Sequence, residues 1–82
     1  MNNNSFSITV PYNGENVLAN VHEEGNELDV VYKVQFPDGY KSTFYIFEVD
    51  DQKGWAELNK GATQLAVDVG IAIDNFLATR NS

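Results

Sequence analysis

The sequence predicts an α+β domain in which a four-stranded antiparallel sheet is covered on one face by a C-terminal helix. Residues 5–50 alternate apolar and polar side chains between three turn signals, which is the period of half-buried strands. From Leu58 onward the apolar residues recur with helical spacing. We therefore expect one domain (1–82) with a disordered tail (1–4), a β-meander in strand order 1-2-3-4, and a helical segment (about 52–80).

The first two strands are predicted to be joined by Asn13-Gly14. This dipeptide favours a two-residue hairpin turn, because both residues accept a positive φ. Such a turn sets Tyr12 opposite Glu15. Counting back along both strands, apolar residues then face apolar residues in the pairs Val10–Val17, Ile8–Ala19 and Phe6–Val21.

Gly25-Asn26 is the second turn signal and suits a type II′ turn with glycine first. The register that it predicts sets two acids, Glu24 and Glu27, opposite each other at the base of the loop. Beyond them it aligns apolar residues in the pairs Val21–Val30, Ala19–Tyr32 and Val17–Val34.

The third turn signal is the stretch FPDGY at residues 36–40, where Pro37 presets φ and Gly39 takes a left-handed conformation. It predicts the pairs Phe36–Tyr40, Tyr32–Phe44 and Val30–Ile46. The three registers together give one continuous apolar face for the helix to cover.

The helix is predicted from apolar residues at positions 58, 62, 65, 69, 72, 73, 76 and 77. Asn59 is one candidate N-cap, and Asp51 is the candidate for a longer helix that carries Trp55 on the same stripe. In either case Trp55 is expected to fill the core where sheet and helix meet. Gly70 costs about 1 kcal/mol relative to alanine inside a helix, so we expect it to allow close approach to the sheet, over Ala19.

Several apolar and basic side chains remain outside this core. They are Val31, Lys33, Lys41, Tyr45, Phe47 and Val49 on the other sheet face, and Val67 and Ile71 on the back of the helix. In a four-stranded order the fourth strand is an unprotected edge, whereas Pro11 guards the first strand. We expect a homodimer or a protein partner bound through strand four, its outer face, or Val67 and Ile71. The alternative is that Tyr45 and Phe47 only shield the sheet.

Catalytic and metal-binding motifs are scarce. His22 is the only histidine, and with Glu23, Glu24 or Asp29 it forms either an acid–base pair, part of a metal site, or solvated strand residues. There is no cysteine, the glycines are isolated, and the acids at Asp50-Asp51 lack the spacing of a calcium loop. We therefore predict a non-enzymatic interaction domain with no cofactor and no metal.

The charge of −7, from 12 acidic and five basic residues, favours solubility and repels phosphate backbones and anionic lipids. The sequence has no apolar run of membrane-spanning length and no signal-peptide pattern at its start. These features predict a soluble cytoplasmic protein without membrane contact.

Single-stranded nucleic-acid binding is the alternative function. Lys33 and Lys41 could meet phosphates while Tyr45 and Phe47 stack on bases of a strand laid across the open sheet. The order of four strands followed by one helix resembles single-strand-binding transcriptional coactivator domains. That resemblance implies single-strand binding and a dimer that the helices help to build.

Overall fold

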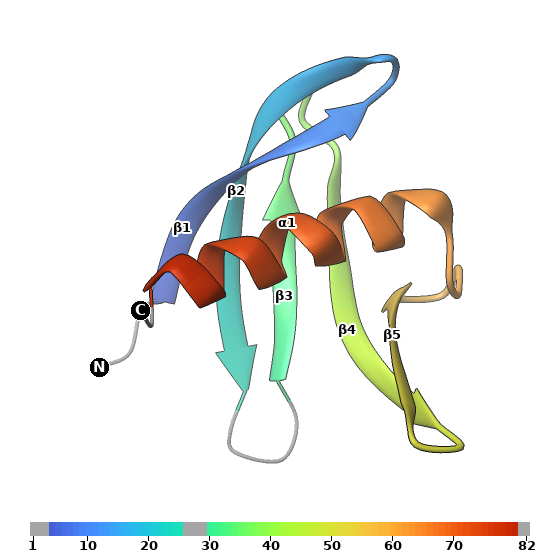
Figure 1. Ribbon diagram of the computed structural model, residues 1–82. Coiled ribbons are helices and arrows are strands. Elements are labelled where there is room, and N and C mark those ends of the chain that lie inside the picture. Colours follow the sequence, from blue (N-terminus) through green and yellow to red (C-terminus); the bar gives the residue numbers. More distant parts are fainter. Residues whose placement is uncertain (1–3, 26–29, 81–82) are drawn as a thin grey trace.

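The computed structural model describes residues 4–25 and 30–80, which form one antiparallel sheet and one helix that crosses its face (Figure 1). The α+β class and the C-terminal helix on the sheet are confirmed, but the sheet has five strands and not four, in the order β1-β2-β3-β4-β5. The tail expected at 1–4 lies outside the described residues except for Asn4, which begins β1. The elements are β1 (Asn4–Tyr12), β2 (Glu15–Gly25), β3 (Val30–Gln35), β4 (Lys41–Val49), β5 (Gln52–Glu57) and α1 (Gln64–Arg80).

The first hairpin has the predicted register. Tyr12 pairs with Glu15, and the pairing continues without a bulge to Asn4 opposite Glu23. Asn13 and Gly14 both have positive φ, 54° and 82°, as the two-residue turn requires.

The register predicted between β2 and β3 is wrong by four residues. Val21 pairs with Val34 and not with Val30, and Glu24 faces Val31 and not an acid. The displacement is an even number of residues, so each side chain keeps its predicted face. It also removes the unfavourable pairing of Glu24 with Glu27, which is the physical reason to prefer it.

The connection predicted at Gly25-Asn26 lies partly outside the described residues. The third turn agrees with its prediction, because Tyr32 pairs with Phe44 and the Phe36 N–H donates to the Tyr40 carbonyl at 2.8 Å. The described pairing of β3 with β4 ends at Val31 and Tyr45, before the predicted pair of Val30 with Ile46.

The segment expected to start the helix is instead a fifth strand. β5 pairs with β4 from Val49–Gln52 to Phe44–Glu57. Asp50 and Asp51, at φ 51° and 64°, turn the chain back, which Asp tolerates better than most residues. Because β5 pairs with the edge of β4 that does not face β3, β4 is an interior strand. The prediction that β4 is the free edge is wrong.

The helix begins later than predicted, at Gln64. The Thr63 hydroxyl accepts a hydrogen bond from the Ala66 N–H at 3.1 Å, so Thr63 is the N-cap, and neither Asn59 nor Asp51 fills that role. Asn59 has a φ of 68° in the turn after β5.

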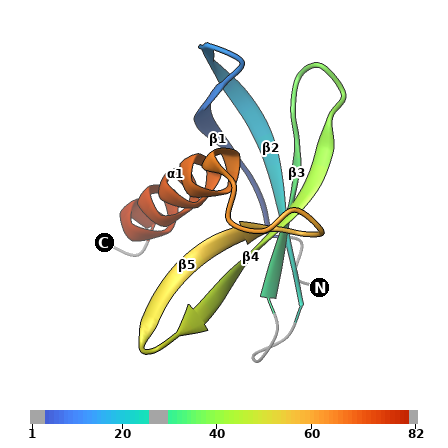
Figure 2. The same ribbon diagram turned by 90° about the vertical axis from the view of Figure 1, so that its right-hand side faces the viewer.

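The core lies between the helix and the sheet, which curls around it (Figure 2). Gly70 allows close approach as predicted, but its neighbour is Trp55 and not Ala19. A Cβ on Gly70 would lie 2.2 Å from Trp55 Cδ1, far inside contact distance. The fully buried large side chains are Val10, Val21, Val34, Phe36, Phe44, Glu57, Val69 and Ile73.

Glu57 is the charged member of that core, with only 2 % of its surface exposed. Its carboxylate accepts hydrogen bonds from the hydroxyls of Tyr40, of Ser42 at 2.6 Å and of Thr63 at 3.2 Å. Lys60 Nζ lies 3.6 Å from the same carboxylate. Because its partners come from β4, the β5–α1 turn and the helix cap, Glu57 ties the fifth strand to the start of the helix.

Candidate functional site

The outer sheet face carries the predicted aromatic residues, but they are partly covered by their own sheet. Tyr45 and Phe47 are half-buried, and the Phe47 ring lies across Gly54 on the neighbouring strand. Ala56, opposite Tyr45, is buried. These contacts favour the interpretation that Tyr45 and Phe47 shield the sheet. Val31 is also half-buried, whereas Val49 is exposed at the end of β4.

The two lysines of the outer face differ in their surroundings. Lys33 Nζ forms an ion pair with Glu24 Oε1 at 3.1 Å, which offsets its charge, and Lys41 is exposed on β4. The fifth strand also removes the topological match to the coactivator domains. Both observations weaken the hypothesis of single-strand binding, which stays an untested prediction. No contact in the described residues favours it.

The helix leaves two residues of the predicted core open, Ile46 on β4 and Leu58 in the turn after β5. Ile46 was expected beneath the helix, yet 45 % of its surface is exposed. It pairs with Trp55, and the Trp55 indole donates to Asp74 Oδ2 at 3.3 Å. Trp55 therefore takes the place against the helix, and Ile46 lies beyond that contact.

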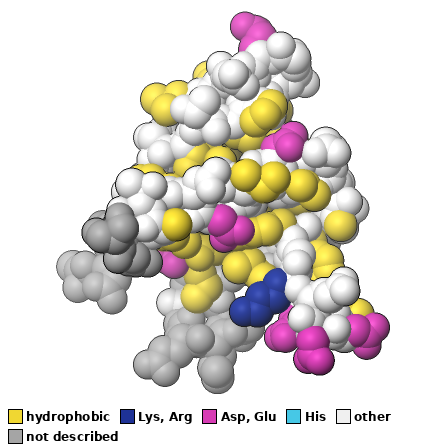
Figure 3. All heavy atoms as spheres, viewed as in Figure 1, with side chains coloured by type: hydrophobic (Ala, Val, Ile, Leu, Met, Phe, Trp, Pro, Cys, Tyr) yellow, Lys and Arg dark blue, Asp and Glu magenta, His cyan; other side chains and the backbone are white. Residues whose placement is uncertain are grey.

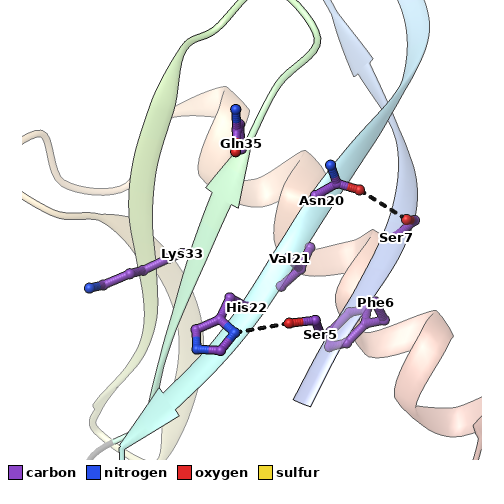
Figure 4. A pocket seen from close by; sticks show the side chains of 8 residues that line it. All are labelled: Ser5, Phe6, Ser7, Asn20, Val21, His22, Lys33 and Gln35. Atoms are coloured by element: carbon purple, nitrogen blue, oxygen red, sulfur yellow. Dashed lines mark hydrogen bonds between the residues drawn. The ribbon is translucent and has the colours of Figure 1, made fainter. Parts of the chain in front are cut away.

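A shallow hollow, lined by polar residues together with Phe6 and Val21, lies on the outer face of β1, β2 and β3 (Figure 4). His22 Nδ1 lies 2.9 Å from the Ser5 hydroxyl, and His22 Nε2 lies 3.4 Å from Glu24 Oε2. The hydroxyl of Ser7 donates to Asn20 Oδ1 at 3.2 Å. The hollow is lined by Ser5, Phe6, Ser7, Asn20, Val21, His22, Lys33 and Gln35.

This arrangement settles which acid accompanies His22. Glu24 is its neighbour, whereas Glu23 accepts a hydrogen bond from Tyr32 in the part-buried region, and Asp29 lies outside the described residues. Within the described ranges no group of three or more metal-binding side chains is present. A hydroxyl, an imidazole and a carboxylate in a row can relay a proton, but this hollow is open to water.

The edge of β1 is the second candidate surface. The two-residue turn makes Tyr12 and Glu15 a hydrogen-bonded pair, and such pairs alternate along an antiparallel ladder. The even-numbered residues therefore bond to β2, and the odd-numbered residues from Ser5 to Pro11 direct their backbone groups away from the sheet. Pro11 lacks an N–H and cannot donate a hydrogen bond to an added strand, but this affects position 11 alone. Ser5, Ser7 and Thr9 each keep an outward donor and acceptor.

The composition of β1 is unusual for an edge strand. Its residues, NSFSITVPY, include no charged side chain in a chain that is 21 % charged. Edge strands are normally protected by lysine, proline, inward charges or covering segments, and of the protective residues β1 has only Pro11. The other edge, β5, has Lys53 and is closed at Glu57 by a bridge to Gly61.

A groove runs between this edge and α1. Two adjoining hollows share Thr9, Ala72 and Asn75. Ile71 lines one of them with 55 % of its surface exposed, and Val67, one turn earlier, is 41 % exposed. Hydrophobic side chains are visible along the outward side of the helix in Figure 3. Both helix residues were predicted to lie away from the core, and the structure confirms this placement.

The sequence prediction does not identify the β1 edge as a binding surface, because it assigns to Pro11 the protection of the whole strand. The signal that identifies it was present, since the hairpin register fixes which residues point outward. No helix in the described residues is long and apolar enough to cross a membrane. No family model, curated protein or solved structure shows a significant match to this chain.

Proposed function

We propose that this protein is a non-enzymatic interaction domain that binds an extended strand along the β1 edge. The observation that carries the proposal is an uncharged edge strand with outward N–H and C=O groups at Ser5, Ser7 and Thr9. An added strand would complete the ladder, a recurring mode of peptide recognition.

The neighbouring groove supports the proposal because it gives an added strand something to contact besides backbone. Side chains of that strand that point toward the helix would meet Ile71, Ala72 and Phe76. Backbone bonds supply affinity in strand addition, and such side-chain contacts supply specificity. The outer face is a weaker candidate, since Tyr45 and Phe47 are already partly covered.

Peptide binding tests the proposal directly. One fluorescent probe has the sequence of residues 4–12, and a second is an unrelated peptide that alternates threonine and valine. We expect at least one probe to bind with a dissociation constant of about 1–100 μM, typical of a small interface. Failure of both probes to bind at millimolar protein would overturn strand addition.

Thr9→Pro is the matched variant for that titration, with Thr9→Val as its control. Proline removes one outward N–H, and Pro11 shows that the strand accepts proline at an outward position. The proline variant should stay folded and lose at least about tenfold in affinity. The valine variant keeps the N–H and should bind the probe like the parent protein. Equal binding by the proline and valine variants would show that the probe does not bind along the β1 edge.

A further inference from the structure

The sequence of β1 indicates which strand its own edge accepts. Ser5, Ser7 and Thr9 place hydroxyls on the outer face, and Phe6 and Ile8 place apolar side chains toward the helix. A strand with this alternation is self-complementary when it pairs antiparallel with a copy of itself, because hydroxyls then face hydroxyls and apolar groups face apolar groups.

We propose that the occupant of the β1 edge is β1 of a second copy, paired antiparallel about a two-fold axis through Ser7. This inference rests on the proposed function and names its partner. In this register Ser5 lies opposite Thr9 of the second copy, and Phe6 lies opposite Ile8 of the second copy. The three outward residues of each strand form about six backbone hydrogen bonds, and the two sheets join into one.

Neighbouring registers are less favourable. A displacement of two residues toward the turn sets Ser5 opposite Pro11, which has no N–H to donate. The opposite displacement sets Ser5 opposite Ser7, and the described residues that it pairs are only 4–8. The register through Ser7 spans residues 4–10, so each Pro11 falls just outside the paired stretch.

The charge distribution allows a second copy at this edge, although Asp68 lines the groove on the helix side. Each chain carries a charge of −7, so association through an acidic surface brings like charges together. The seam between two β1 strands contains no charged side chain from either strand. On the helix side of that seam, Ile71 would lie beside the joined strands, because it already lines the groove at Thr9 and Pro11.

The chain has no cysteine, so single-thiol variants can report the register. In a hydrogen-bonded antiparallel pair the Cα atoms lie about 5.5 Å apart, within the usual range for a disulfide of about 4.4–6.8 Å. Ser7→Cys places the thiols of two copies opposite each other at the axis. Thr9→Cys places them four residues out of register, about 14 Å apart along the strands.

Oxidation of the full chain, monitored by mass and by non-reducing electrophoresis, gives the test. Ser7→Cys should form its disulfide dimer at least about tenfold faster than Thr9→Cys, because pairing raises the effective thiol concentration. A mixture of Ser5→Cys and Thr9→Cys should form the mixed dimer at the faster rate. Equal rates of disulfide formation for Ser7→Cys, for Thr9→Cys and for the mixture would overturn self-pairing. So would a parent protein that sediments as a monomer up to about 1 mM.

The two proposals can fail separately. If the unrelated alternating peptide binds the Thr9→Val protein and not Thr9→Pro, strand addition stands. Equal cross-linking rates in that case would refute only the second copy as occupant. If no probe binds and no register is preferred, both proposals fail.

Discussion

Replacing Glu57 with alanine should destabilise the fold by about 3–4 kcal/mol. The substitution removes an acceptor from three hydroxyls, those of Tyr40, Ser42 and Thr63. Each such bond to a buried carboxylate contributes roughly 1 kcal/mol here, since all three donors regain some water. More than half of the Lys60 side chain is exposed, so solvent screens its attraction to Glu57 and it adds little.

The assay is urea unfolding followed by the fluorescence of the single Trp55 and by circular dichroism. For a domain of this size, 3 kcal/mol corresponds to a fall in Tm of about 12–24 °C. If Glu57→Ala fails to fold, Ser42→Ala measures one of the three bonds and should cost about 1 kcal/mol. A loss below about 0.5 kcal/mol for Glu57→Ala would refute the role of Glu57 as the tie between β5 and α1.

The same carboxylate should make stability depend on pH. Burial is the largest single influence on the pKa of Glu57 and raises it, but the Ser42 and Tyr40 hydroxyls and the Lys60 charge together outweigh burial and hold that pKa below its usual value. The unfolded chain then binds the proton first as the pH falls. The contribution of Glu57 is fully present above the ordinary glutamate pKa and is lost below it. The stability difference between the parent and Glu57→Gln should shrink on acidification; a constant difference from pH 7 to pH 3 would contradict this.

Three further predictions concern packing and titration. Gly70→Ala should cost at least about 2 kcal/mol, because its Cβ would overlap Trp55, and the Trp55 emission should shift; unchanged urea midpoints would contradict the close packing. Burial raises the pKa of the Tyr32 hydroxyl to about 12, so ultraviolet titration should show one tyrosine ionising there, and the associated stability, present below pH 10, should be lost as the pH rises toward 12. Tyr32→Phe should remove that step, and a parent curve with no such step would refute it. Phe47→Glu should lose about 1–2 kcal/mol through its contact with Gly54 yet keep the association of the parent in sedimentation; a folded monomer would place the interface on the outer face.

Local turn chemistry made the first hairpin and the third turn predictable. Asn13-Gly14 allows a single two-residue turn, and this fixes the register for the whole length of β1. The register of β2 with β3 was not predictable in the same way. A four-residue displacement keeps the same faces in contact, so the apolar pattern does not distinguish the two registers.

The fifth strand was missed because Trp55 and Leu58 fit both periods. In the structure Trp55 and the buried Ala56 lie on opposite faces of β5, and Leu58 lies in the turn that follows the strand. The sequence pattern at Asp50-Asp51 fits a strand end or a helix cap, but Asp is also one of the few residues that accept positive φ in a tight turn. This error also assigned the free edge to β4.

Val67 and Ile71 were predictable as outward residues because the helical period alone places them away from the core stripe. What lies beside Ile71 depends on the path of α1 across β1, which no local pattern specifies. The groove could therefore be found only from the folded chain.

Amide hydrogen exchange at Ser7, measured by NMR over a range of protein concentrations, tests the binding edge most directly. The Ile8 amide points to β2 and serves as an internal reference. Protection at Ser7 should rise with concentration while Ile8 stays protected throughout. A Ser7 amide that exchanges at the rate of an open strand at every concentration, with or without either peptide probe, would contradict the account.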